Sequence, residues 1–396
     1  MEPLSGTLQR YTWGTLDAIP TLLGIEADAR PYAEYWLGAH ESSPSTVGGE
    51  SLLDRIAAGP SVLGDRPRKE FGEQLPYLMK VLSARHALSL QAHPSREQAE
   101  EGWARENRAG VALDAPERTY KDAWPKPEIM ISLDEFHSLS GFRDPHRSAE
   151  LFQALGIAPQ LGSVIGPLTE RKGPAALAEV FLDILSLADT RRHLVDEVVA
   201  AAVHHRDDEG ELGDFARTAL ELDAVFPGDP GIVAALLMNR IVLQPGEAIF
   251  VPAGMMHAHL RGTGIEVMAN SDNVIRGGLT AKHIDVPELI QVVQFSPTTP
   301  EILPGNETRP GVWKYETPCS EFEAWRLELD DDLGTIRVPG RGAARILLVV
   351  EGHCTLTNAE GTLSLAKGES AFLSGDDPDV AITGSGRVFG ASSGIR

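Results

Sequence analysis

Residues 243–254 read Leu-Gln-Pro-Gly-Glu-Ala-Ile-Phe-Val-Pro-Ala-Gly, and this stretch decides the predicted fold. Its Pro-Gly pair is typical of a tight turn, and the apolar residues after it predict a short strand. Residues 365–375 repeat the rhythm: a leucine, two residues, Gly-Glu, a small residue, one residue and a phenylalanine. Two such copies predict two jelly-roll β-barrels, unless the likeness arises by chance. A histidine follows only the first copy, so only the first barrel is predicted to hold a metal.

Outward from this stretch, the hydrophobic pattern divides the 396 residues into four segments. Short apolar runs predict strands, and apolar residues at three-to-four spacing predict amphipathic helices. The predicted strands cover 77–82, 87–92 and 128–133, and the predicted helices cover 95–107, 148–155, 175–187, 190–204 and 214–226. The predicted fold is mainly β, with two jelly-roll barrels and an inserted α-helical domain. The first barrel takes residues 1–147 and 236–310, the helical insert takes 148–235, and the second barrel takes 311–396.

Charge and cysteine content exclude several classes of protein. The 57 acidic and 35 basic residues leave a net charge of −22, which argues against nucleic acid and against an anionic membrane as partners. Cys319 and Cys354 are the two cysteines, which excludes a disulfide framework and predicts a reducing compartment. The first ten residues lack an apolar signal segment, and no apolar run approaches the roughly 20 residues that span a bilayer. We therefore expect a cytoplasmic protein, with a monomer as the default.

Two clusters offer metal ligands on predicted strands. Gln91 and His93 are two residues apart, so a strand projects both from the same face, and Pro94 ends that strand. The alternative is a buried, hydrogen-bonded histidine beside a surface glutamine. Glu128 opens the apolar run 129–131, where the alternative is a carboxylate at a solvated strand end.

The third cluster reads Pro252-Ala-Gly-Met-Met-His257-Ala-His259. A Pro-Gly turn, a strand and then Pro-x-Gly-x-x-His is the cupin pattern for presenting an inward imidazole. His259 shares a face with His257 in a regular strand, so it is a competing ligand. Two imidazoles, a carboxylate and an amide suit one Zn²⁺ ion with an open position. Fe²⁺ or Mn²⁺ would also fit this donor set.

Basic residues gather near these ligands in a chain that is otherwise acidic. Arg276 offers planar bidentate contacts to a phosphate, and Lys282 adds a point charge. Two more lysines lie close in sequence to the first two ligand clusters, namely Lys80 and Lys126. The alternative is that Arg276 and Lys282 form structural salt bridges with acidic residues of the same segment, Glu266 or Asp272.

These residues belong to ordered motifs that resemble the type I mannose-6-phosphate isomerases of the cupin superfamily. The motifs are Tyr11-x-Trp13-Gly14, Ala33-Glu-Tyr-Trp36-Leu-Gly38-Ala-His40, Leu75-Pro76-x-Leu-x-Lys80-Val81-Leu82, Gln91-Ala-His93-Pro94, Tyr120-Lys-Asp122, Lys126-Pro127-Glu128, the segment from Pro252 to His257, and Glu266-Val-Met-Ala-Asn-Ser-Asp-Asn-Val-x-Arg276-x-Gly278. The resemblance implies that one zinc ion is held by Gln91, His93, Glu128 and His257.

The resemblance also implies that the protein interconverts mannose 6-phosphate and fructose 6-phosphate through a cis-enediol. This reaction needs an electrophile, proton-transfer groups and a phosphate clamp, and a lysine base would need a lowered pKa. The predicted catalytic residues are Arg276, Lys126, Asp272, Lys80 and Glu266, of which Lys126 and Arg276 rank first and Asp272 with Lys126 opens the sugar ring. The predicted substrate-binding residues are Ser89, Trp13, Lys282 and Arg276.

Two positions depart from the family pattern. Pro125 stands where the family often has a histidine before Lys-Pro-Glu, so a ring-opening role of that histidine is not expected here. His259 stands where a tyrosine is usual.

Two other functions fit part of the pattern. A cupin dioxygenase would hold iron through two histidines and a carboxylate, but it leaves the lysine and arginine residues unexplained. A non-catalytic sugar-phosphate sensor would use the metal only for structure. Iron content with oxygen consumption would indicate the dioxygenase, and a metal-loaded protein without turnover would indicate the sensor.

Overall fold

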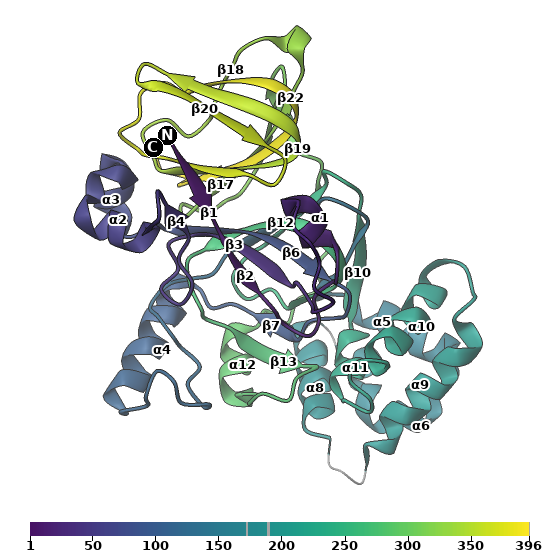
Figure 1. Ribbon diagram of the computed structural model, residues 1–396. Coiled ribbons are helices and arrows are strands. Elements are labelled where there is room, and N and C mark those ends of the chain that lie inside the picture. The colour runs from purple at the N-terminus through teal and green to yellow at the C-terminus, as the bar shows by residue number, and fades with distance from the viewer. Residues whose placement is uncertain (172, 188–190, 396) are drawn as a thin grey trace.

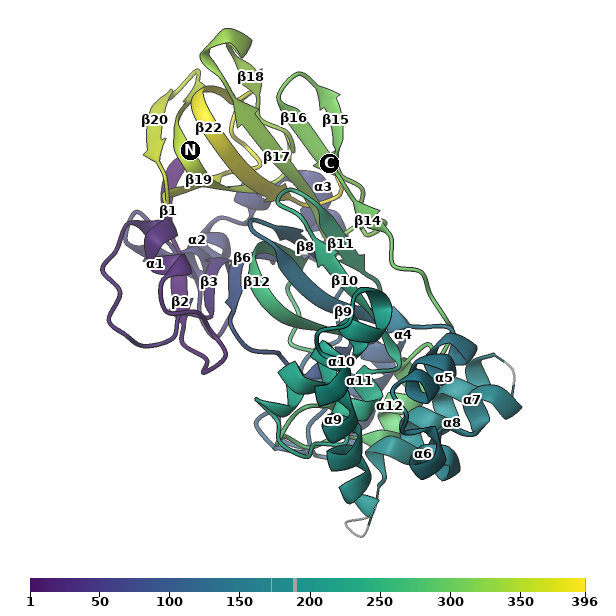
Figure 2. The ribbon, with the colours of Figure 1, turned by 90° about the vertical axis from the view of Figure 1, so that its right-hand side faces the viewer.

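The computed structural model describes residues 1–171, 173–187 and 191–395. It confirms the predicted mainly β fold, in which two barrels are joined and a group of helices is inserted into the first (Figure 1). The helical insert lies at the opposite end of the molecule from the second barrel, as both ribbon views show (Figures 1 and 2).

The first barrel is built around one long strand. Its strands are β2 (Thr7–Gln9), β3 (Glu34–Gly38), β6 (Tyr77–Ala84), β7 (Leu90–Ala92), β8 (Glu128–Ser132), β9 (Phe136–Phe142), β10 (Met238–Leu243), β11 (Ala248–Val251), β12 (His257–Ala269), β13 (Ile275–Gly278) and β14 (Ile302–Leu303). The second half of β12 pairs with β6 and β8, and its first half pairs with β7 and β9. Because β12 pairs with all four of these strands, side chains from them converge on its inward face.

The predicted strands of this barrel differ from the structure mainly in length. Residues 77–82 lie within β6, and 128–133 correspond to β8. The tight turn and the short strand that opened the prediction are present, because a turn after β10 leads into β11. The prediction for 87–92 was too long: β7 starts only at Leu90, and the Leu88 N–H donates outside the ladder to the carbonyl of His259.

The second barrel contains strands from both ends of the chain. Its strands are β1 (Glu2–Ser5), β4 (Thr46–Val47), β5 (Glu50–Ser51), β15 (Asn306–Arg309), β16 (Val312–Tyr315), β17 (Glu323–Leu329), β18 (Ile336–Arg337), β19 (Arg345–Asn358), β20 (Gly361–Ala366), β21 (Ser370–Leu373) and β22 (Ala381–Ser392). The N-terminal strand β1 pairs with β21, so the structure differs from the prediction that gave all of residues 1–147 to the first barrel. Strands this short carry no periodic pattern that reveals their partner.

Buried hydrogen bonds tie the two barrels together. The Tyr77 hydroxyl in the first barrel donates to the carbonyls of Ala344 and Ala391, each at 3.1 Å. In the other direction, the Tyr315 hydroxyl donates to the carbonyl of Gly246 at 2.8 Å. The second barrel therefore supports the turn before β11.

The helices of the insert are α5 (Pro145–Ala154), α6 (Ala158–Ile165), α7 (Pro167–Glu170), α8 (Pro174–Leu185), α9 (His193–His205), α10 (Gly210–Asp223) and α11 (Gly231–Ala235). The predicted helices 148–155, 175–187 and 214–226 match α5, α8 and α10 within a few residues. The predicted helix 190–204 matches α9, although its first residue, Thr190, lies outside the described residues. Helices α6, α7 and α11 were not predicted, because their runs are too short to show a helical period.

The remaining helices surround the barrels: α1 (Ala18–Leu23), α2 (Leu52–Ala58), α3 (Asp65–Phe71), α4 (Arg96–Arg108), α12 (Val286–Val292) and the 3₁₀ turns η1 (Pro60–Leu63) and η3 (Asp331–Leu333). Helix α4 confirms the predicted helix 95–107. Its N-cap Ser95 accepts from the Gln98 N–H, and the Gln98 side chain accepts from the Ser95 N–H, which satisfies two free donors.

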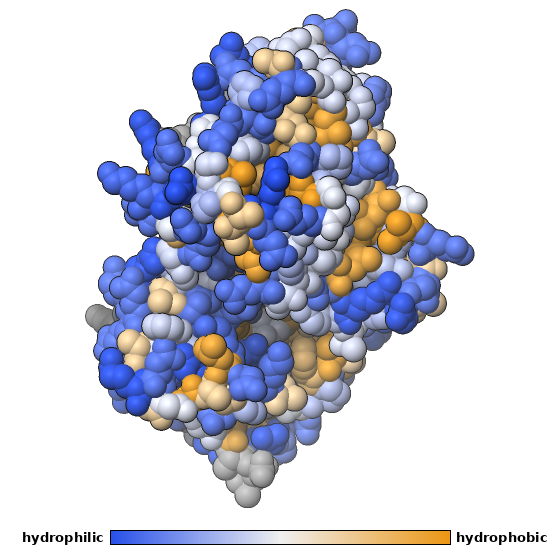
Figure 3. Space-filling model, turned by 60° about the vertical axis from the view of Figure 1, so that its left-hand side comes forward, coloured by the Kyte–Doolittle hydropathy of each residue, from blue (hydrophilic) through white to orange (hydrophobic). Residues whose placement is uncertain are grey.

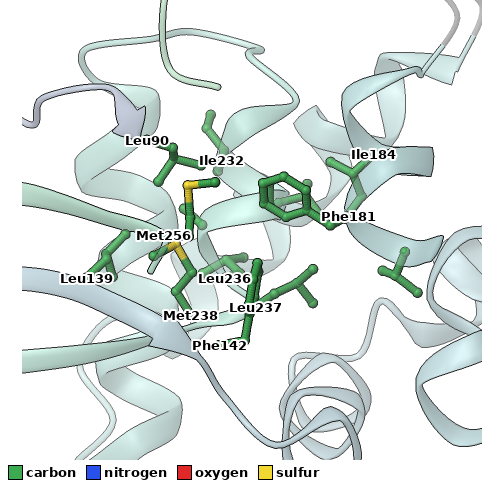
Figure 4. Close-up of a cluster of buried hydrophobic side chains, with 14 of the residues drawn as sticks. Leu90, Leu139, Phe142, Phe181, Ile184, Ile232, Leu236, Leu237, Met238 and Met256 are labelled. Carbon is green, nitrogen blue, oxygen red and sulfur yellow. The ribbon is translucent and has the colours of Figure 1, made fainter. Parts of the chain in front are cut away.

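An apolar cluster fixes the insert to the back of the metal-site strands (Figure 4). Leu90 and Met256 come from the barrel, and Phe181 comes from α8; all three are fully buried. Leu90 precedes Gln91 and Met256 precedes His257, and successive strand residues point to opposite faces. Packing against the insert on one face therefore holds Gln91 and His257 toward the barrel interior on the other.

The face of the molecule in Figure 3 is mostly hydrophilic, with apolar groups in separate patches. Within residues 1–171, 173–187 and 191–395, no helix has the length and apolar character needed to cross a bilayer.

Replacing Gly390 with alanine is expected to destabilise the second barrel. A Cβ there would lie 2.0 Å from the indole ring of Trp325, which is buried in the facing strand β17. Overpacking of this kind costs about 1–3 kcal/mol, so the apparent Tm should fall by several degrees. Gly162→Ala in α6 is the control, since a Cβ there meets nothing within 4 Å, and it should preserve or slightly raise Tm. An unchanged Tm of Gly390→Ala would contradict this packing.

Candidate metal centre and active site

Three antiparallel strands place the four predicted metal ligands. Gln91 on β7 stands directly opposite His257 on β12, and Glu128 stands opposite Met268 farther along the same strand. His93 follows the end of β7, where its carbonyl accepts from the Gly254 N–H at 2.8 Å. That bond ties the loop before His257 to the strand that carries Gln91.

The ligand atoms of three of these residues converge in the barrel interior. His93, Glu128 and His257 offer atoms that all lie within 4.8 Å of one another, and all three residues are buried. The His93 Nε2 lies 3.3 Å from Glu128 Oε1, and the His257 Nε2 lies 3.3 Å from Glu128 Oε2. The sequence therefore predicted this convergence.

Hydrogen bonds on the far side of each ring set the protonation of the two imidazoles. The His93 Nδ1 donates to the carbonyl of Asn273 at 2.8 Å, and the His257 Nδ1 donates to the carbonyl of Met255 at 3.2 Å. A neutral imidazole carries one proton, so both Nε2 atoms direct lone pairs at the Glu128 carboxylate. Burial lowers the pKa of His93, in keeping with its neutral form.

This cluster fits a bound cation. His93 Nε2 and Glu128 Oε2 are buried polar atoms without a hydrogen-bond partner. Buried acceptors are normally satisfied, and outward donation to a carbonyl is the usual orientation of metal-binding histidines. The Gln91 amide lies 3.3 Å from the His257 Nε2, and rotation of the amide exchanges its oxygen and nitrogen. Gln91 can therefore add a neutral oxygen to the set.

His259 does not join this cluster, which answers the question that the sequence left open. Among the described residues, the cluster that could hold a metal contains His257 but not His259. The His259 Nδ1 instead lies 2.7 Å from Ser138 Oγ, and its Nε2 lies 3.7 Å from Glu266 Oε1.

A buried group of charges lies beside the metal cluster. Lys80 on β6 stands opposite Glu266 on β12, with Nζ 3.2 Å from Glu266 Oε2 and 3.4 Å from Glu34 Oε1. Burial alone would lower the pKa of Lys80, but the two glutamates raise it above its ordinary value. Lys80 therefore keeps its proton and does not meet the condition for a lysine base. Burial would raise the pKa of Glu266, but Lys80 and His259 hold it below its ordinary value.

Lys126 and Asp272 lie near this charged group, because the charges of Lys126 and Lys80 both lower the pKa of Asp272. The Lys126 Nζ donates to Glu128 Oε1 at 3.2 Å, so it is within reach of anything bound at the metal cluster. Asp272 is half-exposed, and His40, which the sequence did not single out, lies 3.2 Å from its carboxylate through Nε2. Because the Ser42 N–H donates to the His40 Nδ1, the His40 Nε2 carries the proton and donates to Asp272.

Three cations gather where β13 leaves the barrel. Arg276 stands opposite Gln91 on β7, and burial lowers the pKa of its guanidinium. The pKa of Lys282 is lowered, first by the charge of Arg276, next by burial and then by the charge of Lys121. The three cations are therefore close neighbours. Within the described parts of the chain, neither Arg276 nor Lys282 has a carboxylate within 4.0 Å, so the alternative of structural salt bridges is not supported. Arg276 and Lys121 line a cavity of about 60 Å³.

Comparison with known proteins matches the whole chain to one family. Residues 1–145 match the family model described as phosphomannose isomerase type I, catalytic domain, and residues 326–391 match the one described as mannose-6-phosphate isomerase, cupin domain. Mannose-6-phosphate isomerase of Shigella flexneri is 36% identical over 398 residues, which cover 98% of each chain. The chain belongs to the mannose-6-phosphate isomerase family.

Other relatives of the family agree with this. Mannose-6-phosphate isomerase 1 of Arabidopsis thaliana is 31% identical and covers 95% of this chain and 90% of its own. A crystal structure of mannose 6-phosphate isomerase bound with zinc and yttrium matches with a TM-score of 0.89, 33% identity and 99% of each chain. The apo enzyme of Salmonella typhimurium matches with the same TM-score, identity and coverage. The predicted resemblance is confirmed.

Two further predicted substrate residues of this family member, Trp13 and Ser89, are partly buried. Trp13 is partly buried, packs against an apolar cluster of the barrel and stacks on Tyr11 at 5.6 Å between ring centroids. Ser89 lies in the loop before β7 and is partly buried. Tyr11, which the sequence did not single out, lies near the charged group, because the charge of Glu34 acts on it. Burial is the main cause that raises the pKa of Tyr11, and Glu34 raises it further. Its phenol therefore keeps its proton and can donate a hydrogen bond.

Trp124 and Pro125 stand in the segment that departs from the family pattern. The Trp124 ring lies beneath the guanidinium of Arg96 at 3.8 Å and beside the ring of Phe71 at 6.0 Å. Its carbonyl accepts from the Asn273 side chain at 2.9 Å. This segment therefore serves to anchor the loop of Asn273, whose own carbonyl orients His93.

Proposed function

We propose that the chain is a zinc-dependent isomerase that interconverts mannose 6-phosphate and fructose 6-phosphate. The observation that carries this proposal is a cluster of three buried acceptors beside a group of unpaired cations. The acceptors His93, Glu128 and His257 fit a divalent metal, and Arg276 with Lys282 fits a phosphate. One zinc ion, the metal named for a relative, would be held by these three residues and Gln91 and would supply a Lewis acid.

The phosphate would bind at the cationic end of the site. Arg276 offers a planar pair of donors, and Lys282 and Lys121 add charge from neighbouring loops. Arg276 and Lys121 repel the charge of Lys282, and a dianion relieves that repulsion. Binding there leaves the C1 and C2 end of the open-chain sugar pointing toward the metal cluster.

Proton transfer would fall to the residues around that cluster. The reaction removes a proton from C2 of the aldose and returns one to C1, while the hydroxyl proton at C2 moves to the oxygen on C1. Lys126 is placed to exchange a proton at the reacting carbons, because it already contacts Glu128. Lys80, which stays protonated, would stabilise negative charge on the enediolate. Glu266 is ionised and can accept a proton.

Ring opening would take place at the solvent-exposed edge of the site, where Asp272 lies. Asp272 is held by His40 and by its own backbone N–H, which donates to Asp122 at 2.8 Å. Partial loss of solvent would raise the pKa of Asp272, but His40 lowers it, so Asp272 is an acceptor for the anomeric hydroxyl proton. Lys126 is the partner acid, and Ser89, Trp13 and Tyr11 would line the path of the sugar. We further propose that the chain is a monomer. We also propose that it works in the cytoplasm, since both cysteines are free.

The two other functions that the sequence left open are not favoured. The relatives described above are isomerases, and a dioxygenase leaves the cationic end of the site without a role. Incubation with mannose 6-phosphate and coupled detection of fructose 6-phosphate tests the proposal. Steady formation of fructose 6-phosphate is expected, and a zinc-loaded protein that forms none would support the sensor.

Gln91→Ala is expected to weaken zinc binding more than it weakens folding. Gln91 is partly exposed, and within the described residues its amide forms a side-chain hydrogen bond with His257 alone. Loss of a neutral oxygen ligand should raise the zinc Kd by about 10–100-fold, while the apo Tm moves by only a few degrees. Competition with a chromophoric chelator measures the Kd. An unchanged Kd would remove Gln91 from the ligand set.

A further inference from the structure

A buried histidine lies on β12, the strand that carries both the proposed metal ligand His257 and the proposed catalytic carboxylate Glu266. His259 is on β12, two residues beyond His257, and is 2% exposed. Its Nε2 faces Glu266 Oε1 at 3.7 Å, and its Nδ1 lies 2.7 Å from Ser138 Oγ on β9. The ring therefore lies between its cross-strand neighbour Ser138 and Glu266, which is farther along β12.

The neighbours of the ring determine where its proton lies. Glu266 is ionised and can only accept, so a neutral His259 must present Nε2–H to it. The Nδ1 is then the acceptor, and the Ser138 hydroxyl is the donor. The three residues form one directed chain, from the Ser138 hydroxyl through the imidazole to the Glu266 carboxylate.

The ring has little freedom to leave this arrangement. The Phe136 ring meets it edge-on at 5.2 Å between centroids. The His259 carbonyl accepts from the Leu88 N–H at 2.9 Å, which fixes the backbone. On the other side of Glu266, Lys80 holds Oε2 at 3.2 Å. Each oxygen of the carboxylate thus faces its own donor.

We propose that His259 is a positioning residue that holds Glu266 in its reactive orientation; this rests on the proposed isomerase function. When the contact to His259 shortens to a hydrogen bond, both oxygens are held and the plane of the carboxylate is fixed relative to the metal cluster. Without His259, Lys80 is the one partner that holds the carboxylate among the described residues, and the carboxylate can turn about its last torsion. The 3.7 Å separation is longer than a hydrogen bond, and such contacts shorten when substrate binds.

The experiment compares His259→Phe, which removes the donor, with His259→Gln, which keeps an N–H at a similar reach. His259→Phe should lower kcat by about 10–100-fold, the range seen when a residue that orients an active group is lost. KM for mannose 6-phosphate and bound zinc should stay within about twofold of the wild type, because the phosphate and metal residues are untouched. His259→Gln should recover most of kcat. Equal losses in both variants, or a loss in KM alone, would overturn the proposal.

A double-mutant cycle with Glu266→Gln isolates the contact itself. If His259 acts through Glu266, adding His259→Phe to Glu266→Gln should lower kcat by less than about threefold, because the two losses are not additive. A full additive loss would overturn the proposal. His137→Phe is the matched control: this buried histidine on β9 contacts Arg240 and Arg261, away from the site, and kcat should be unchanged.

Two further results keep the test decisive. If His259→Phe fails to fold, Ser138→Ala replaces it and should lower kcat by about threefold to tenfold by freeing the ring to change tautomer; an unchanged kcat would overturn the proposal. Wild-type turnover separates this inference from the function on which it rests. A wild type without turnover refutes the isomerase proposal, whereas an active wild type with a fully active His259→Phe refutes only the role of His259.

Discussion

Glu128→Gln is expected to abolish turnover and to raise the zinc Kd by more than about 100-fold. Mutation of a residue that only orients a metal ligand already lowers metal affinity or activity by about 10–100-fold, and Glu128 is a proposed ligand itself. The variant keeps the volume of the side chain and removes its charge. Glu128 is the carboxylate between the two imidazole lone pairs, so the cation loses its one anionic ligand. Lys126 also loses its ion-pair partner, and its ammonium then opposes a cation at the same place.

Zinc content after dialysis and kcat at saturating zinc measure this effect. Glu135→Gln is the matched control, because Glu135 is exposed and contacts His137 outside the site. Zinc retained at the wild-type level in Glu128→Gln would show that the metal binds elsewhere. Normal turnover without bound zinc would show that catalysis does not need this cluster.

Arg276→Ala is expected to leave zinc bound and to lower kcat/KM by on the order of 10²–10³-fold, the cost of one donor aimed at developing charge. Arg276 lies on β13 opposite Gln91 and has no carboxylate partner among the described residues, so its removal breaks no structural ion pair. Arg276→Lys keeps the charge but not the planar pair of donors, and it should recover only part of the loss.

Inhibition by inorganic phosphate separates a phosphate role from a structural one. The inhibition constant for phosphate should rise in Arg276→Ala and rise less in Arg276→Lys. Arg337→Ala is the control, because that arginine is exposed and pairs with Asp379 on the second barrel. A near-normal kcat/KM in Arg276→Ala would refute the assigned role.

The metal cluster was predictable because each ligand belongs to a local pattern. Gln91 and His93 alternate on one strand, and His257 follows a turn, a strand and a proline. What could not be predicted depends on contacts between distant segments. His40 reaches Asp272 across 232 positions, and the proximity of Tyr11 to Glu34 follows from the pairing of β2 with β3.

Two further points needed three-dimensional information. Lys80 is a plausible base by composition, but the structure surrounds it with Glu34 and Glu266, so its pKa rises instead of falling. Strand β1 is a short run with no period, and only its pairing with β21 places it in the second barrel. In both cases the deciding partner lies far away in sequence, and local propensity carries no information about it.

Titration of the metal-free protein with zinc tests the central claim most directly. The chain is stripped with a chelator, and fructose 6-phosphate formation from mannose 6-phosphate is followed as zinc is added back. Turnover should rise in proportion to bound zinc and reach its plateau at one ion per chain, the number that the cluster of His93, Glu128 and His257 can hold. Turnover that persists without metal, or zinc binding that restores none, would contradict the account.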